Sequence, residues 1–247
     1  MDIQPKRFPL FNLSFGSQTK KESLNEVMLL AENIRASSVI FANAHVVVEA
    51  ERQLSYREVL ASATLLVPDG VPIAWLMHSK GAKAAERYSG PDLMADLLTS
   101  PHGLSKRHFF LGSTSKNLAL IKEKFKGTAC GFYSPPFEEN EFSEDELLKQ
   151  VNMIDASEAD YIWVGLGAPK QERYVVKMAS RSKKGVFLAV GAAFDFYAGV
   201  KPRAPVFLQK LGLEWAFRLA SEPRRLTGRY LTTNPKFIRL ALKELLS

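Results

Sequence analysis

An aspartate stands at the end of a short apolar run, in the segment Val67-Pro68-Asp69-Gly70. A carboxylate at the carboxyl end of a strand can act as a general base and remove a proton from an attacking hydroxyl group. Pro-Asp-Gly is also an ordinary turn sequence, so the segment alone does not require chemistry. We take Asp69 as the candidate catalytic residue.

Two other carboxylates occupy informative positions. Asp195 lies between Phe194 and Phe196. It needs a partner because burying an unpaired carboxylate beside aromatic rings is costly, and Arg203 is one candidate. Asp92 falls in an expected first helical turn, where helix capping is its expected role. Asp195 is therefore the candidate binding residue of the two.

Several arginines have the chemistry to hold a phosphate, because a guanidinium group offers forked donors. The candidates are Arg87, Arg218, Arg224, Arg225 and Arg229, and an ordinary solvated position is the alternative for each. The sequence has no Asp-x-Asp pair to hold a divalent metal on a nucleotide diphosphate. We therefore expect no metal and no other cofactor. If the substrate is a nucleotide-sugar, cationic side chains must neutralise the leaving group.

The segment 165–172, GLGAPKQE, leads directly into an expected helix. Gly165 and Gly167 let a ligand approach the backbone, and the helix N-terminus offers free amides to a phosphate. Lys170 and Gln171 belong to the same candidate binding segment. The segment is neither a P-loop nor a complete GxGxxG motif, and a plain strand-to-helix turn would use the same residues.

Short apolar runs alternating with helical periodicity predict an α/β fold that positions these residues. The expected strands are 38–42, 64–67, 108–112, 128–132, 160–166 and 186–191. The expected helices are 19–35, 71–80, 91–98, 114–126, 143–157 and 169–182. Such strands form a Rossmann-like, mostly parallel sheet with helices on both faces. Ligands bind outside the carboxyl ends of its strands, where Asn43, Asp69 and Gly165 stand.

The pattern changes after residue 200, where prolines punctuate helical segments at 206–221, 224–231 and 235–246. Residues 201–247 contain ten Lys and Arg against three acids, which accounts for the whole net charge of +7. We interpret 1–200 as one domain and 201–247 as a basic helical appendage. Its charge suits an anionic partner: a phospholipid surface, a nucleic acid or a diphosphate. Amphipathic helices of this kind either lie in a membrane interface or pack on the core with solvated arginines.

Composition excludes several classes of protein. Of 247 residues, 46% are hydrophobic and 24% charged, which excludes a disordered or collagen-like chain. A single cysteine, Cys130, excludes an internal disulfide and a Cys-based zinc cluster. No signal peptide and no membrane-spanning stretch is visible, so we expect a cytoplasmic location.

Five segments, in this order along the chain, resemble the WecG/TagA/CpsF glycosyltransferases (glycosyltransferase family 26). They are 41–43 (FAN), 68–72 (PDGVP), 87–93 (RYSGPDL), 164–172 (VGLGAPKQE) and 191–229, with FDFYAG, RAP, LQKLGLEW and EPRRL. The last segment is the most specific, and the resemblance spans about residues 8 to 232.

The resemblance implies a bacterial enzyme of exopolysaccharide, teichoic acid or surface-antigen assembly. Such enzymes move a sugar from a UDP-sugar to a polyprenyl-diphosphate-linked saccharide, with inversion, at the inner face of the cytoplasmic membrane. Donors in the family are UDP-glucose, UDP-N-acetylmannosamine and its uronic acid. The family also implies a homo-oligomer. We expect a metal-independent hexosyltransferase of peripheral membrane location.

The resemblance further implies residue roles. The family's proposed base corresponds to Asp69, and its pocket residues correspond to Asn43, Arg87 and Gln171. Its appendage, which docks on the membrane and completes the site with arginines, corresponds to about 201–247. The family often has Thr where this chain has Phe41, so an N-acetylmannosamine donor is not assumed.

Two hypotheses from other classes stay open. A non-catalytic nucleotide- or polyanion-binding protein would use only the basic tail, and the absence of a nucleic-acid motif counts against nucleic acid as its partner. A membrane-peripheral scaffold would lose only its location on deletion of 201–247, whereas the enzyme would lose activity as well.

Overall fold

The computed structural model describes residues 6–138 and 141–246, and within them six strands form one parallel sheet. The strands are β3 (Ser37–Ala42), β4 (Leu65–Pro68), β5 (Arg107–Gly112), β6 (Thr128–Tyr133), β7 (Tyr161–Gly165) and β8 (Val186–Ala189). They lie in the order β4-β3-β8-β7-β5-β6, and each begins and ends within two residues of the predicted range. The predicted parallel α/β sheet is confirmed.

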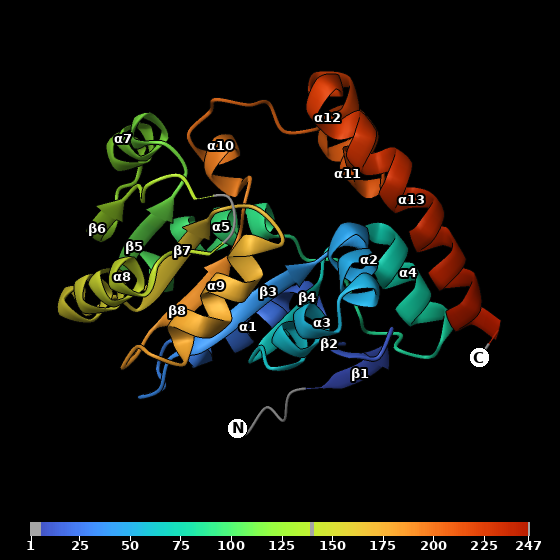
Figure 1. Ribbon diagram of the computed structural model, residues 1–247, viewed down its shortest axis with the longest axis horizontal. Helices are drawn as coiled ribbons and strands as arrows, with labels where there is room; N and C mark the ends of the chain where they lie inside the picture. The colour runs from blue at the N-terminus through green and yellow to red at the C-terminus, as the bar shows by residue number, and fades with distance from the viewer. Residues whose placement is uncertain (1–5, 139–140, 247) are drawn as a thin grey trace.

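Alternate side chains of the strands fill two cores, one on each face of the sheet. In β3, Val39 and Phe41 enter one core while Ile40 and Ala42 enter the other. The first core is covered by α1 (Lys20–Leu30), α5 (Gly90–Thr99), α7 (Ser115–Lys124) and α10 (Ala193–Tyr197). The second is covered by α2 (Ala44–Arg52), α3 (Leu54–Ala61), α4 (Val71–Ser79), α8 (Glu144–Ser157) and α9 (Lys170–Ala179). Helices therefore cover both faces, as predicted (Figure 1).

Some elements were not predicted. The strands β1 (Arg7–Leu10) and β2 (Leu13–Gly16) form a separate antiparallel hairpin, and α6 (Pro101–Leu104) is a single turn. The helices α2 and α3 occupy a stretch left without an element. The run Val46 to Val48 explains this omission, because β-branched residues are weak helix formers. Their burial, together with capping by Asn43, makes the helix here.

The helical segment after residue 200 is confirmed, with two corrections. The predicted helix 206–221 is broken into α11 (Val206–Lys210) and α12 (Glu214–Ser221), with Gly212 at a φ of 72° between them. The predicted helices 224–231 and 235–246 are one helix, α13 (Pro223–Leu246), which runs through Pro235. Proline leaves one carbonyl of the preceding turn unbonded, here that of Leu231. Leu231 is 71% exposed, so water can satisfy that carbonyl.

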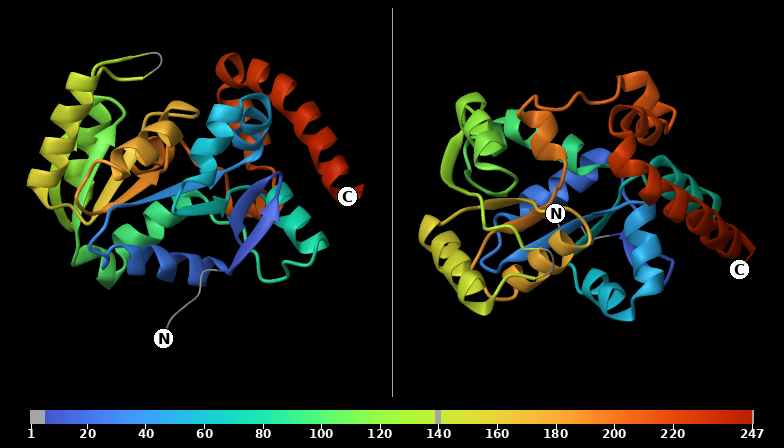
Figure 2. Two further views of the ribbon diagram at one scale, coloured as in Figure 1. Left: turned by 60° about the horizontal axis from the view of Figure 1, so that its bottom comes forward. Right: turned by 45° about the horizontal axis from the view of Figure 1, so that its top comes forward.

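One face of α13 packs on the rest of the protein. Phe237 is 6% exposed and its ring lies 5.8 Å from that of Phe11, next to the hairpin. The helix runs along α2 and past α4, at the end of the molecule away from α7 and α8 (Figures 1 and 2). None of the helices in the described ranges has the length and apolar character needed to cross a membrane.

Candidate functional site

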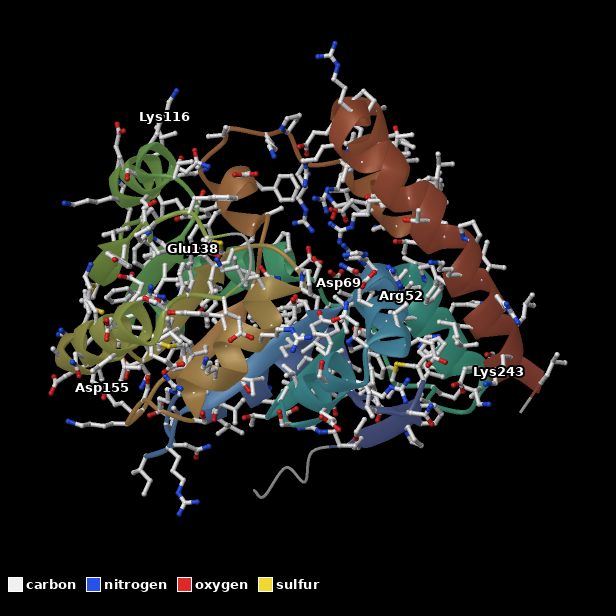
Figure 3. The ribbon with its side chains drawn as sticks, in the orientation of Figure 1. Arg52, Asp69, Lys116, Glu138, Asp155 and Lys243 are labelled. Atoms are coloured by element: carbon white, nitrogen blue, oxygen red, sulfur yellow. The ribbon has the colours of Figure 1, made fainter. Side chains whose placement is uncertain are left out.

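A cavity of about 380 Å³ lies between the carboxyl ends of two strands and the C-terminal helices. Asn43 follows β3 and Asp69 follows β4, and both line the cavity. The Asp69 amide donates a hydrogen bond to the Ala42 carbonyl at 2.9 Å, which holds the two strand ends side by side. Arg218 from α12 and Arg229 from α13 line the cavity on the side of the appendage. Figure 3 shows Asp69 facing the C-terminal helices, in a space where nitrogen-bearing side chains gather.

The Asp69 carboxylate is partly desolvated and has no hydrogen-bond partner among the described residues. Its side chain is half-buried, and no other described residue forms a hydrogen bond with it. Burial raises the pKa of Asp69 to about 6, against the opposing charges of Arg87 and Arg218. The nearby carboxylates of Glu214 and Asp92 add to the rise. At neutral pH the group is mostly ionised, and it is roughly a hundredfold more basic than an ordinary aspartate.

Two cavity-lining arginines have no acid partner within the described ranges. The Nε atoms of Arg218 and Arg229 are buried without a hydrogen-bond partner among the described residues. Within the same residues, neither guanidinium group lies within ion-pair distance of a carboxylate. Burial lowers the pKa of Arg229, since the fold desolvates its charge. Half-buried cations whose Nε donors are buried and unpaired favour an anionic ligand with several oxygens, such as a diphosphate.

The other predicted arginine of the cavity belongs to a ring of alternating charges. Arg87 Nη1 contacts Asp92 at 3.0 Å and Arg87 Nη2 contacts Glu214 at 2.7 Å. Arg203 closes the ring, at 2.6 Å from Asp92 and 3.8 Å from Glu214. Asp92 also forms a reciprocal capping box with Ser89, which confirms its capping role. The ring ties α12 to α5 and so holds Arg218 over the cavity.

Asp195 lies in a second series of ion pairs outside the cavity lining, and Arg203 is not its partner. Asp195 instead pairs with Lys201 at 2.9 Å and accepts from Asn117 at 2.9 Å. Lys201 also contacts Glu222 at 2.9 Å, and Arg225 binds the same carboxylate at 2.8 Å. The prediction of Arg203 was wrong because Arg203 is held in the ring with Asp92.

The predicted loop 165–171 follows β7 at the same edge of the sheet, but its residues do not line the cavity. Gln171 Oε1 accepts from the Gly167 amide at 3.0 Å, and Gln171 Nε2 donates to buried Glu172 at 2.9 Å. The Lys170 ammonium lies 3.8 Å from the centre of the Phe142 ring. The structure thus brings together Asn43, Asp69, Arg87, Arg218 and Arg229. It leaves Gly165, Gly167, Lys170, Gln171, Asp195, Arg224 and Arg225 outside the lining.

Further lining residues were missed by the sequence analysis. His45 Nδ1 lies 3.3 Å from Thr233 Oγ1, and burial with the charge of Arg229 lowers the pKa of His45 to about 4. Trp215 and Tyr230 meet edge to face at 5.8 Å. The sequence signal for the lining residues of α13 was their spacing, since residues 226, 230, 233 and 237 recur at helical intervals and so share one face of the helix. Ending the helix before Pro235 hid this repeat.

The amino-acid sequence is similar to known proteins over nearly its whole length. The model of the glycosyl transferase WecG/TagA/CpsF family matches residues 8–247. A Bacillus spizizenii protein is 29% identical over 223 residues, covering 89% of this chain and 83% of the relative. A Staphylococcus aureus protein is 25% identical over 223 residues, covering 88% of this chain and 85% of the relative. Both relatives are named N-acetylglucosaminyldiphosphoundecaprenol N-acetyl-beta-D-mannosaminyltransferase.

Proposed function

Since the chain belongs to the WecG/TagA/CpsF family of glycosyl transferases, we propose that it moves a sugar from a UDP-sugar to a polyprenyl-diphosphate-linked saccharide, with inversion. One observation carries the proposal. A half-buried carboxylate, Asp69, shares a cavity with Arg218 and Arg229, two half-buried cations whose Nε atoms are buried and which have no acid partner among the described residues. This arrangement suits a base acting opposite a diphosphate leaving group.

The reaction proceeds in one displacement. Asp69 accepts the proton of an acceptor hydroxyl while the hydroxyl oxygen forms a bond to the anomeric carbon. The bond from that carbon to the phosphate oxygen breaks, and UDP leaves with the bonding electrons. Arg218 and Arg229 neutralise the charge that grows on the diphosphate. Because they and the base lie on different sides of the cavity, attack and departure are on opposite faces of the sugar, which inverts the anomeric centre.

Asn43 is the proposed contact for the donor next to Asp69. Its Oδ1 accepts from the amides of His45 and Val46 at 3.0 and 3.3 Å, where it caps α2. That capping fixes the side chain with its Nδ2 available to a ligand oxygen. Replacing Asn43 would therefore affect both helix capping and ligand binding.

For the donor sugar we propose N-acetylmannosamine ahead of glucose and N-acetylmannosaminuronic acid. The names of both relatives support this choice. Phe41, which replaces the threonine often found in the family, is buried in the core edge to face with Tyr88 at 6.5 Å. It is not among the residues lining the cavity, so this replacement is no argument against the amino sugar.

A transfer assay tests the function. Purified protein is incubated with each of the three UDP-sugars and a short-chain polyprenyl-diphosphate N-acetylglucosamine, and UDP release and product mass are followed. We expect one donor to give a lipid-linked disaccharide whose NMR coupling constant shows inversion. No transfer with any donor, together with salt-sensitive binding of polyanions, would favour the non-catalytic alternative.

We also propose that 201–247 holds the enzyme on the inner face of the cytoplasmic membrane. Beside the packed face of α13, an exposed apolar stripe comprises Leu231, Pro235, Ile238, Leu242 and Leu245, and Ile238 also lines the cavity. A basic stripe of Lys236, Arg239 and Lys243 runs beside it. An apolar stripe flanked by cations is typical of helices that lie in an anionic lipid interface.

A further inference from the structure

Trp75 is a large apolar side chain of the domain 1–200 that is exposed to solvent. Of the three tryptophans in the chain, Trp163 is fully buried and Trp215 lines the cavity. Trp75 is 60% exposed, on the outer face of α4, whose inner face packs Ile73 and Met77 into the core. Exposure of an indole ring to water is unfavourable, and its amphipathic character suits a membrane interface.

The outer face of α4 adjoins the C-terminal helices. Gly212 packs so closely on Val71 that an added Cβ atom would lie 3.0 Å from the valine side chain. Val71 stands one helical turn before Trp75, and Leu211 and Leu213 on either side of Gly212 are exposed. The helix α13 also contacts α4, at the same end of the molecule (Figures 1 and 2). Exposed apolar side chains of body and appendage are therefore neighbours.

The charges around Trp75 suit an anionic lipid surface. Residues 71–85 contain no acid, and Lys83 is exposed among them. The neighbouring helix α13 supplies the basic stripe of Lys236, Arg239 and Lys243. No carboxylate of α4 would repel phospholipid head groups.

We propose that α4, through Trp75, forms one membrane-contact surface with the turn 211–213 between α11 and α12 and with α13. Residues of both 1–200 and 201–247 then contact an anionic phospholipid bilayer. The inference rests on the proposed docking of 201–247 and assigns part of that contact to residues 1–200. The cavity is lined by Val71 and Pro72 of α4 and by Ile238 of α13, so its rim belongs to this surface. The surface thereby presents the cavity to a diphosphate at head-group depth.

Lipid quenching of tryptophan fluorescence tests the contact. Wild type and Trp75→Phe are each mixed with phosphatidylglycerol vesicles whose acyl chains are brominated near the head group, and with unbrominated vesicles. We expect quenching in wild type and loss of most of it in Trp75→Phe. We also expect Trp75→Ala to lower the vesicle partition coefficient roughly tenfold, because an interfacial ring is removed. Equal quenching of wild type and Trp75→Phe, or no quenching of vesicle-bound wild type, would overturn the inference.

A matched control places a tryptophan elsewhere. Ile34 is 89% exposed and precedes β3, at the opposite edge of the sheet from the cavity. Ile34→Trp combined with Trp75→Phe should show no more quenching than Trp75→Phe alone, and quenching as strong as in wild type would overturn the proposed orientation. Concentration-dependent dimerisation without lipid that Trp75→Ala abolishes would assign the surface to a second copy instead. Transfer to a short-chain acceptor in detergent-free solution is measured in parallel. If wild type transfers the sugar and binds vesicles but is not quenched, this inference alone is refuted.

Discussion

Asp69 is a carboxylate whose surroundings favour its protonated form, although the proposed reaction needs it ionised. Its pKa of about 6 arises chiefly from desolvation in the cavity. A base with this pKa is still mostly ionised at neutral pH and accepts a proton more readily than an ordinary aspartate. The same desolvation makes the folded state less stable when the group is charged.

Replacing Asp69 with Asn should therefore stabilise the protein near neutral pH. The pKa of Asp69 is higher in the folded state than its ordinary value, so the wild type loses stability as pH rises from about 4 through 6. We expect Asp69→Asn to melt a few degrees higher than wild type at about pH 7, and at the same temperature near pH 4. Thermal denaturation followed at both pH values measures this. A variant less stable than wild type at pH 7 would contradict the assigned environment.

Arg218 and Arg229 should determine the affinity for the leaving group. Each charge-assisted hydrogen bond to a phosphate contributes about 1.5 kcal/mol or more, so Arg218→Ala and Arg229→Ala should each weaken UDP binding at least roughly tenfold. Arg224→Ala is the matched control, because Arg224 is exposed and lies outside the cavity lining. Isothermal titration with UDP gives the comparison. Equal affinities of all three variants and wild type would refute the assignment.

At the scale of elements, the ring of Arg87, Asp92, Arg203 and Glu214 should fix the position of α12. Its members are half-buried, so removing one leaves an opposite charge poorly compensated. We expect Arg203→Met to increase amide hydrogen exchange across α12 and to lower the transfer rate by roughly tenfold or more.

Exchange in α5 should change little, because capping by Ser89 still holds its first turn. Lys177→Met is the control, since Lys177 forms exposed ion pairs with Glu141 and Glu144 that contribute little to stability. If Arg203→Met left exchange in α12 at the level of wild type, the ring would not be what positions this helix.

The sheet could be predicted from sequence because its strands are short, continuous apolar runs that alternate with helices. The helix α13 could not be predicted correctly, since Pro235 ordinarily ends a helix. Here Leu231, whose carbonyl loses its partner, is an exposed residue, so water can replace the missing hydrogen bond. Pairing of charges was also beyond the sequence. Arg87 and Glu214 are 127 residues apart, and only the folded chain brings the start of α12 next to the segment that precedes α5.

For the candidate site, the position after each strand correctly singled out Asn43 and Asp69. The loop 165–171 also follows the carboxyl end of a strand, β7, yet the cavity forms at the ends of β3 and β4, on the other side of β8. The reason is that α13 packs on α2 and α4, which follow β3 and β4. Which strand end becomes a cavity depends on where the appendage packs. The sequence does not encode that docking as a local pattern.

At the scale of the whole molecule, the contribution of the basic stripe of α13 to membrane binding should be separable from transfer activity. The triple variant Lys236→Glu, Arg239→Glu and Lys243→Glu changes exposed residues outside the cavity lining. Each basic residue near an anionic membrane contributes about 1 kcal/mol, so we expect vesicle association to fall at least roughly a hundredfold. Transfer to a short-chain acceptor in solution should stay near the wild-type rate.

The control for this variant reverses charges at the other end of the molecule. Lys116 on α7 lies far from α13 (Figure 3), and Lys116→Glu with Lys122→Glu should leave vesicle association nearly unchanged. Similar losses for both variants would show that binding follows net charge and not the α13 surface. Co-sedimentation with phosphatidylglycerol vesicles measures both.

The most direct test of the proposed function is the turnover of Asp69→Asn with a UDP-sugar and a polyprenyl-diphosphate-linked acceptor, with UDP affinity measured on the same preparation. Loss of a general base should lower kcat by roughly a thousandfold. UDP affinity should stay within about twofold of wild type, because Arg218 and Arg229 are unchanged. Turnover at the wild-type rate would contradict the role of Asp69 and the proposed displacement.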